Sequence, residues 1–308
     1  MLLIFNMKAE GKEGAVTKKK TLVLVAAILL ILALTHPGTM SGAETGFAIR
    51  LYGGLGYQNV GDLNTGLKGF SDSIIYYAMG LWYAAGGGYG LMHTGIDLGG
   101  DIIFQFSPNI GIGIGSGYLR TSRTSELKLS APNPSLHNEN FTFTPSVSVV
   151  PIRASLFVFL PLARSLKISL NAGAEYYLAS ISSLIRDEYP AWWWNEREDK
   201  ATGRGFGFHG GIGLEIRLAS ELSLILEGQG RVAKIKELTG THAYRNSFGY
   251  EDTMNGTLYY WTDMWLFEPF PYVFVNDTLP SDPWQQNPRK AVLDLSGWSA
   301  VAGFLFRF

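Results

Sequence analysis

Charged side chains recur at alternate positions in several apolar stretches of this chain. Arg50 lies between two aliphatic residues, and so do Asp97 and Glu215. A period of two places such residues on one face of a strand and the aliphatic residues on the other. The charged face collects Arg50, Asp97, Asp101, Arg153, Glu175, Glu215, Arg217, Glu227, Arg231 and Arg307. Arginine forks bond carboxylates bidentately, so we expect a salt-bridged network. A conduit for ions or small solutes is the functional alternative.

Hydrolytic chemistry is the next class to consider, because a histidine base needs a hydroxyl and an acidic orienter within reach. The histidines are His36, His93, His137, His209 and His242, and none has a serine two residues later. A loop-borne set of His242, Ser247 and Asp252 stays open. We expect no catalytic residues and no enzyme activity, with a lipid-modifying enzyme as a weak third hypothesis.

Metal and cofactor chemistry has little support in the sequence. The chain has no cysteine, and its histidines and carboxylates do not cluster at metal-ligand spacing. Its Gly-x-Gly runs fall within strand patterns rather than at strand-to-helix turns, where a phosphate loop would lie. We therefore predict no metal and no cofactor.

Aromatic residues gather in two polar segments between the strand patterns. The candidate ligand surface comprises Trp192, Trp193, Trp194, Trp261, Trp265 and Phe267. Aromatic rings of this kind form belts at membrane interfaces. They also mark surfaces that contact an apolar ligand, a glycan or a protein. Both interpretations stay open.

The N-terminal segment indicates export. Lys18, Lys19 and Lys20 precede an apolar run over residues 21–35, which is shorter than the roughly 20 residues of a spanning helix. Small residues ending at Ala43 complete the pattern of a signal peptide, which we assign to residues 1–43. Removing it leaves a domain over residues 44–308 with a net charge of −4. Without a basic block, nucleic acid is not an expected partner.

Period-two alternation predicts eight strands, listed as residues 46–57, 92–106, 110–122, 141–160, 166–181, 205–218, 222–236 and 290–308. Pro151 cannot donate to a ladder, so we expect a bulge and a parity change there. Three connections are short turns, and four are long: 58–91, 123–140, 182–204 and 237–289. The fold class predicted is all-β. It is an eight-stranded antiparallel transmembrane β-barrel with short periplasmic turns, long extracellular loops and periplasmic termini. Such a barrel has an interior just wide enough for its own side chains.

Two further features of the long connections bear on the architecture. The stretch 258–275 could add a hairpin and give ten strands, but Pro269 and Pro271 favour an ordered outer loop. In the first long connection, Ser71 is a candidate N-cap for a short helix that packs as a lid.

The final residues, Gly303-Phe-Leu-Phe-Arg-Phe308, place three rings on one face of a strand. Gly303, Phe306 and Phe308 resemble the C-terminal assembly signal of bacterial outer-membrane barrels. Together with the turn 107–109 and the stretch 151–161, they make the chain resemble the small eight-stranded OmpW/OmpA-like outer-membrane proteins.

This resemblance implies location in the outer membrane of a Gram-negative cell envelope and insertion by the barrel assembly machinery. It also implies contact with outer-membrane lipid and lipopolysaccharide. OmpW-like members are associated with passage of small hydrophobic molecules. The function we expect is a narrow-lumen, porin-like protein that binds or passes small hydrophobic solutes. The alternative is a structural or surface-binding, adhesin-like envelope protein that acts through its aromatic-rich loops.

Overall fold

The computed structural model describes residues 45–133, 136–189, 193–265 and 268–308. The expected signal peptide, Trp192 and Phe267 therefore lie outside the described residues. The elements are β1 (Gly46–Gln58), α2 (Asp62–Gly80), β2 (Ala84–Gly87), β3 (Thr94–Ser107), β4 (Ile110–Ser122), β5 (Ser125–Ser130), β6 (Glu139–Ala163), β7 (Leu166–Tyr189), β8 (Trp193–Arg217), β9 (Leu222–Ile235), β10 (Leu238–Asn246), β11 (Glu251–Trp265), β12 (Glu268–Asn276), β13 (Gln285–Lys290), β14 (Leu293–Asp294) and β15 (Gly297–Arg307).

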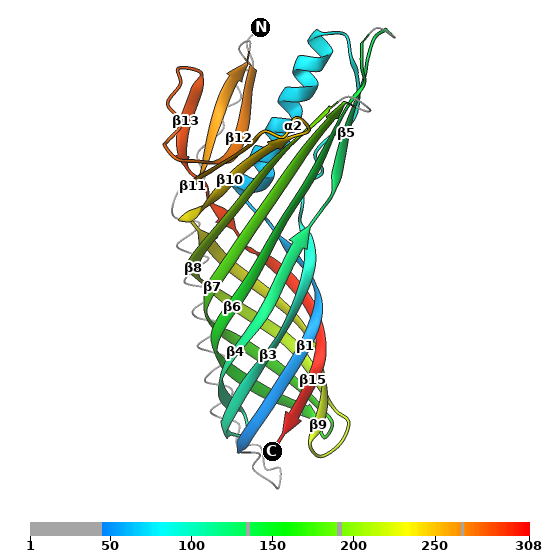
Figure 1. The fold of residues 1–308 in the computed structure, drawn as a ribbon. Coiled ribbons are helices and arrows are strands. Elements are labelled where there is room, and N and C mark those ends of the chain that lie inside the picture. The colour runs from blue at the N-terminus through cyan, green and yellow to red at the C-terminus, as the bar shows by residue number, and fades with distance from the viewer. Residues whose placement is uncertain (1–44, 134–135, 190–192, 266–267) are drawn as a thin grey trace, which may run out of the picture.

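Antiparallel pairing closes part of this sheet into a ring (Figure 1). Its order is β8-β7-β6-β4-β3-β1-β15-β9, and the pairing of β9 with β8 completes the circle. The ladders are long and regular, as in β1 with β3, where Arg50 lies opposite Asp101. The prediction of an antiparallel all-β fold is confirmed. Closure leaves these strands without an unpaired edge.

The ring carries apolar side chains on its outer face and charged side chains in its lumen, the reverse of a water-soluble barrel. Ile112 is 52% exposed and Leu214 is 41% exposed, whereas Arg50 is 4% exposed and Glu215 is 2% exposed. Successive residues of a strand point to opposite faces, so the apolar residues lie on the outer face and the charged ones in the lumen. Other outward apolar residues are Phe47, Ile49, Leu51, Leu55, Ile96, Leu98, Ile102, Phe104, Ile114, Ile152, Phe206, Phe208, Ile212, Val232 and Phe304.

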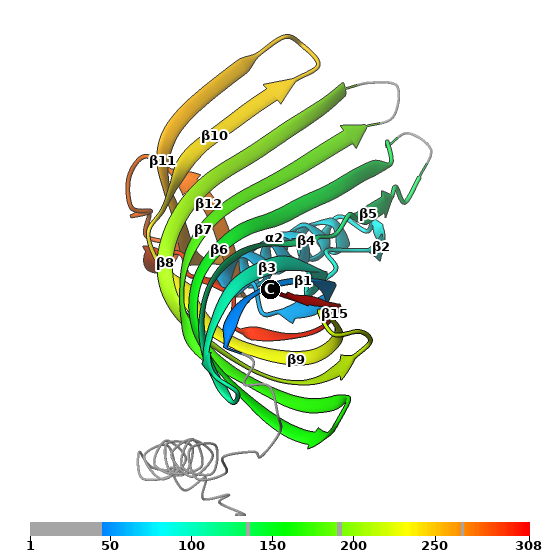
Figure 2. The same ribbon diagram turned by 90° about the horizontal axis from the view of Figure 1, so that it is seen from below.

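The two ends of the ring differ. The turn end carries the short connections β3–β4, β6–β7 and β8–β9, together with the start of β1 and the end of β15. At the opposite, helix end, β6, β7 and β8 continue beyond the ring (Figure 1). They are joined by β5 and β2 on one side and by β10, β11 and β12 on the other. Figure 2 shows this outer sheet curling away from the ring, with α2 on its concave side.

The outer sheet corrects two of the predicted long loops. Residues 182–189 and 193–204 are the upper parts of β7 and β8, and most of residues 237–289 form β10, β11, β12 and β13. Arg186 pairs with Glu196 at 2.7 Å, and Arg245 lies 3.5 Å from the same carboxylate. Such cross-strand ion pairs stabilise a hairpin whose outer face is wet. The stretch 258–275 does contain a hairpin, but it belongs to the outer sheet and adds no strand to the ring.

Helix α2 is longer than predicted, and Ser71 is not its N-cap. The helix begins at Asp62, whose carboxylate accepts hydrogen bonds from Arg289 at 2.9 Å and from the backbone N–H of Val292 at 2.7 Å. A carboxylate in the first turn also complements the helix dipole. Ser71 lies within the helix, where its hydroxyl accepts the Tyr89 N–H.

Glycine lets α2 approach the outer sheet closely. A side chain at Gly66 would begin 2.5 Å from Val273 of β12, and one at Gly69 would overlap Pro271. The neighbouring Leu63 and Leu67 are buried in the same contact region. The helix backbone therefore rests directly on β12.

The bulge expected at Pro151 is absent, and that prediction was wrong. Pro151 pairs in register with Tyr177 of β7, and burial alternates without a break from Phe141 to Phe157. Toward β4, the pairing skips residues 117 and 118 and resumes in the same register. The Ser116 hydroxyl donates to the Pro151 carbonyl at 2.9 Å. The strand thus accommodates proline by losing a short stretch of ladder rather than by shifting parity.

Candidate functional site

The structure places the predicted charged residues inside the ring. Arg50, Asp97, Asp101, Arg153, Glu175, Glu215, Glu227, Arg231 and Arg307 are all buried, each less than a tenth exposed. Arg217, at the end of β8, is only half-buried. Arg217 lies at the rim of the turn end. Alternation assigns a residue to a face of the strand but not to a depth in the lumen, so it did not separate Arg217 from the buried residues.

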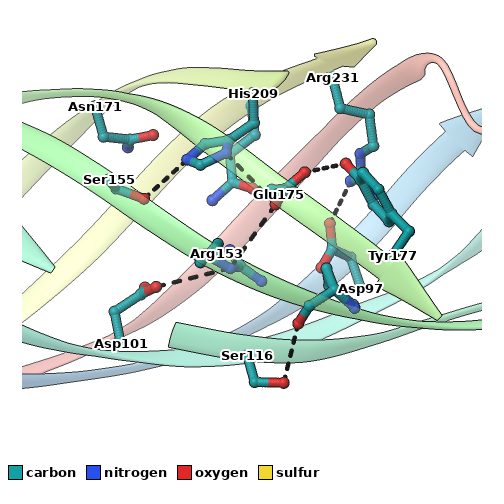
Figure 3. A network of polar contacts seen from close by, with 12 residues as sticks. Asp97, Asp101, Ser116, Arg153, Ser155, Asn171, Glu175, Tyr177, His209 and Arg231 are labelled. Carbon is teal, nitrogen blue, oxygen red and sulfur yellow. Dashed lines mark hydrogen bonds and ion pairs between the residues drawn. The ribbon is translucent and has the colours of Figure 1, made fainter. Parts of the chain in front are cut away.

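Arg50 is the centre of the lumen network. Its guanidinium contacts Asp101 at 2.7 Å and Glu227 at 2.6 Å. Arg153 lies 3.7 Å from Asp101 and 3.8 Å from Glu175 (Figure 3). Planar guanidinium groups bridge several carboxylates in this way because they present donors in fixed directions.

Two smaller groups extend the network toward the ends of the ring. Arg231 pairs with Asp97 and donates to the Ser299 hydroxyl at 2.9 Å. Nearer the turn end, Arg307 pairs with Glu215 at 2.6 Å and donates to Ser223 at 3.0 Å. Buried carboxylates and guanidinium groups are therefore in contact with one another, as a filled interior requires.

A serine, a histidine and a carboxylate also meet in the lumen (Figure 3). The Ser155 hydroxyl lies 3.0 Å from Nε2 of His209, and Nδ1 of His209 lies 3.5 Å from Glu175. These are the residue types of a nucleophile, a base and an orienting acid. All three are less than a tenth exposed, and Arg153 and Tyr177 also contact Glu175. Ser155 is therefore enclosed by its neighbours in the lumen.

Apolar residues fill the lumen on the helix side of the charged band and part of it on the turn side. Along β6, the inward residues change from Phe143, Val147 and Val149 to Arg153 and then to Phe157. The first group belongs to a large core that continues into α2 and the outer sheet. Phe157 belongs to a smaller apolar cluster with Ala48, Ile103, Phe159, Ile225 and Leu305. Glu215 and Arg307 lie beside that cluster, opposite Ile225 and Ala48, so the turn end of the lumen is partly charged.

A separate cavity of about 380 Å³ lies at the helix end, between α2 and the outer sheet. We call it the helix-end pocket. Its wall comprises Phe70, Ser73, Ile74, Tyr77, Ala78, Leu81, Tyr83, Leu129, Glu139, Phe141, Tyr189, Trp265 and Tyr272. Mostly apolar walls with few polar groups, at this volume, are typical of small-molecule sites.

The aromatic wall is held by ring contacts between elements. Tyr77 of α2 meets Trp265 of β11 edge to face, with centroids 5.6 Å apart. Phe70 meets Tyr272 of β12 in the same manner at 5.7 Å. The Tyr272 hydroxyl donates to Ser73 at 2.8 Å, which fixes that ring against the helix. The pocket wall is thus assembled from segments far apart in the sequence.

The predicted aromatic surface is divided by the structure. Trp265 lines the helix-end pocket, and Trp261 is buried behind it in a stack with Tyr272. Trp193 stacks on Tyr189, and Trp194 lies over the guanidinium of Arg186 at 4.8 Å.

Glu139 is the one carboxyl group among the described residues that line the pocket. The pKa of Glu139 is raised to about 7, chiefly by burial and also by the nearby Asp187 carboxylate, while a hydrogen bond from Tyr189 acts in the opposite direction. Burial likewise raises the pKa of Asp187. Burial and a neighbouring carboxylate thus both disfavour the charged form of Glu139.

The comparisons with known proteins identify no family. No family model matches the chain, and no curated protein matches it. Among solved structures, the chain is similar to the solid-state NMR structure of outer membrane protein AlkL in DMPC lipid bilayers, at 13% identity and a TM-score of 0.30. The alignment covers 89% of this chain and 96% of that one. At so low a TM-score, the fold of this chain rests on its own strand pairing.

Two features are absent from the part of the chain that the structure describes. In the ranges that the structure describes, no three histidine or carboxylate side chains come together as a metal site would require. Over the same ranges, no helix has the length and hydropathy to span a bilayer.

Proposed function

We propose that this chain is an integral outer-membrane β-barrel that binds small hydrophobic solutes at its helix-end pocket. The ring supports the location, because a closed barrel satisfies its backbone polar groups within the sheet and presents an apolar face to lipid. The turn end then faces the periplasm and the helix end faces outward. Insertion by the barrel assembly machinery and contact with lipopolysaccharide belong to the same proposal.

The observation that carries the binding function is the aromatic cavity of about 380 Å³ between α2 and the outer sheet. It has the size and apolar character of a ligand site. In the middle of the lumen, by contrast, charged side chains pair with one another. The proposed activity is binding, without a catalytic step.

The test is binding of the neutral fluorescent probe phenylnaphthylamine to the refolded full-length protein in maltoside micelles. We expect saturable fluorescence enhancement by the wild-type protein. Ile74→Trp would fill the pocket from α2, and Leu81→Trp would narrow its mouth. Each variant should lower probe affinity by at least about tenfold, the loss expected when a bulky ring occupies an apolar site.

Phe248→Trp is the matched control, because Phe248 is 79% exposed and does not line the pocket. It should bind the probe as the wild-type protein does. A gel comparing unheated with boiled samples checks that each variant retains its barrel. Equal probe binding by the wild-type protein and both pocket variants would refute the proposed site.

A further inference from the structure

We propose that the helix-end pocket selects hydrophobic molecules that carry an ammonium group, such as alkyl or aryl ammonium amphiphiles. This inference rests on the proposed function and adds the chemical class of the ligand. Its basis is the composition of the wall, which combines one carboxyl group with electron-rich rings. The tyrosine and tryptophan members are Tyr77, Tyr83, Tyr189, Trp265 and Tyr272.

Aromatic faces attract organic cations through the ring quadrupole, and tryptophan and tyrosine do so most strongly. These rings come from α2, the segment that follows it, β7, β11 and β12, so several elements contribute them to the wall. Several aromatic faces around one cavity are the arrangement that recognises alkylated ammonium groups. A neutral ligand of the same shape would gain the apolar contact but not this electrostatic attraction.

Glu139 supplies the counter-charge. It lies at the start of β6, opposite Leu129 of β5, and interacts with Asp187 and Tyr189 of β7. The lining residues contributed by α2, β11 and β12 carry no charged group. Arg197 of β8 is a nearby cation. Its charge lowers the pKa of Asp187, and its guanidinium lies over the Phe70 ring, 5.6 Å from the ring centroid. When both carboxyl groups are ionised, their two negative charges exceed the single positive charge of Arg197. This balance favours a cationic ligand and disfavours an anionic one.

The charge state of the pocket gives the expected pH dependence. The pKa of Glu139 is raised to about 7, so the carboxylate is present above that pH and is lost as pH falls through it. The ammonium ligand keeps its charge across this range. Its affinity should therefore fall on acidification, whereas the affinity of a neutral ligand should not.

The experiment compares phenyltrimethylammonium with its uncharged isostere tert-butylbenzene by isothermal titration of the full-length protein in maltoside micelles, with empty micelles as blanks. At about pH 8.5, the cation should bind roughly tenfold more tightly than the isostere. In Glu139→Gln this preference should fall to within about twofold at the same pH. At about pH 5, the wild-type protein should lose most of the preference as well.

Glu126→Gln is the matched control, since Glu126 on β5 has a side chain 59% exposed and pairs with Lys128. It should keep the full preference for the cation. Equal affinity of the wild-type protein for both molecules, or an unchanged preference in Glu139→Gln, would overturn the inference. Phenylnaphthylamine binding reports on the pocket itself, so its persistence in those cases would separate a wrong ligand class from a wrong site.

Discussion

Removal of Arg50 is the sharpest test of how the lumen is held together. Its side chain is 4% exposed and contacts two carboxylates whose side chains are at most 1% exposed. Arg50→Met keeps most of the packing against Tyr52 and Phe157, whose rings lie about 5 Å from the guanidinium. The substitution therefore removes charge and hydrogen bonds far more than it removes volume.

The size of the stability loss depends on which partners Asp101 and Glu227 retain after Arg50 is removed. Asp101 retains Arg153 at 3.7 Å, and Glu227 retains the amides of Asn171 at 2.9 Å and Gln229 at 2.7 Å. Breaking one side of a buried ion pair costs about 3–5 kcal/mol. Both carboxylates lose Arg50 but keep another partner. We therefore expect a loss at the lower end of this range, about 3 kcal/mol of unfolding free energy.

The assay is urea unfolding of the refolded protein in lipid vesicles, followed by tryptophan fluorescence. The control is Lys128→Met, which breaks an ion pair of 3.2 Å between side chains 65% and 59% exposed, and should cost less than about 1 kcal/mol. The double variant Arg50→Met with Glu227→Gln should recover at least about 1 kcal/mol, since it removes one of the two orphaned charges. If Arg50→Met costs no more than Lys128→Met, the lumen is wet and the argument fails.

Two further predictions concern the helix and the lumen. Gly66→Leu should push α2 away from Val273 and lower phenylnaphthylamine affinity by at least about tenfold, whereas Gly80→Ala, which has open space beside it, should leave binding unchanged. Both variants should show the same heat-dependent gel shift as the wild-type protein, because the ring does not depend on α2. In planar bilayers, the wild-type protein should give no resolved unitary current, since paired charges fill the middle of the lumen and a large apolar core lies on its helix side. Stepwise conductance would contradict that filling.

The ring could be predicted from the sequence because its two faces meet opposite environments. Strands such as β1 and β3 carry a clear signal, with apolar residues outward and charged or small residues recurring inward. The charged residues were found for the same reason. Their partners were not, because a pairing such as Arg50 with Glu227 depends on strands that are 177 residues apart.

The outer sheet could not be predicted in the same way. Its strands face α2 on one side and water on the other, and their outer residues form ion pairs, so residues 182–204 resemble a polar loop. Helix α2 did leave a signal, because Leu63, Leu67, Phe70 and Ile74 follow helical spacing. Glu139 left no comparable signal in the sequence, because its proposed role depends on α2, β5 and β7 meeting around it.

The arrangement favours binding over passage along the barrel axis. A solute in the helix-end pocket lies next to the large apolar core, which contains Leu67, Phe141 and Phe143, and the charged band lies beyond that core. Travel through the lumen would require the solute to displace this core and then to separate ion pairs such as Arg50 with Asp101. The second step alone costs several kcal/mol per pair and would leave an apolar solute among unpaired charges. For the binding proposed above, exit from the pocket would therefore lead past α2 or the edges of the outer sheet, away from the lumen.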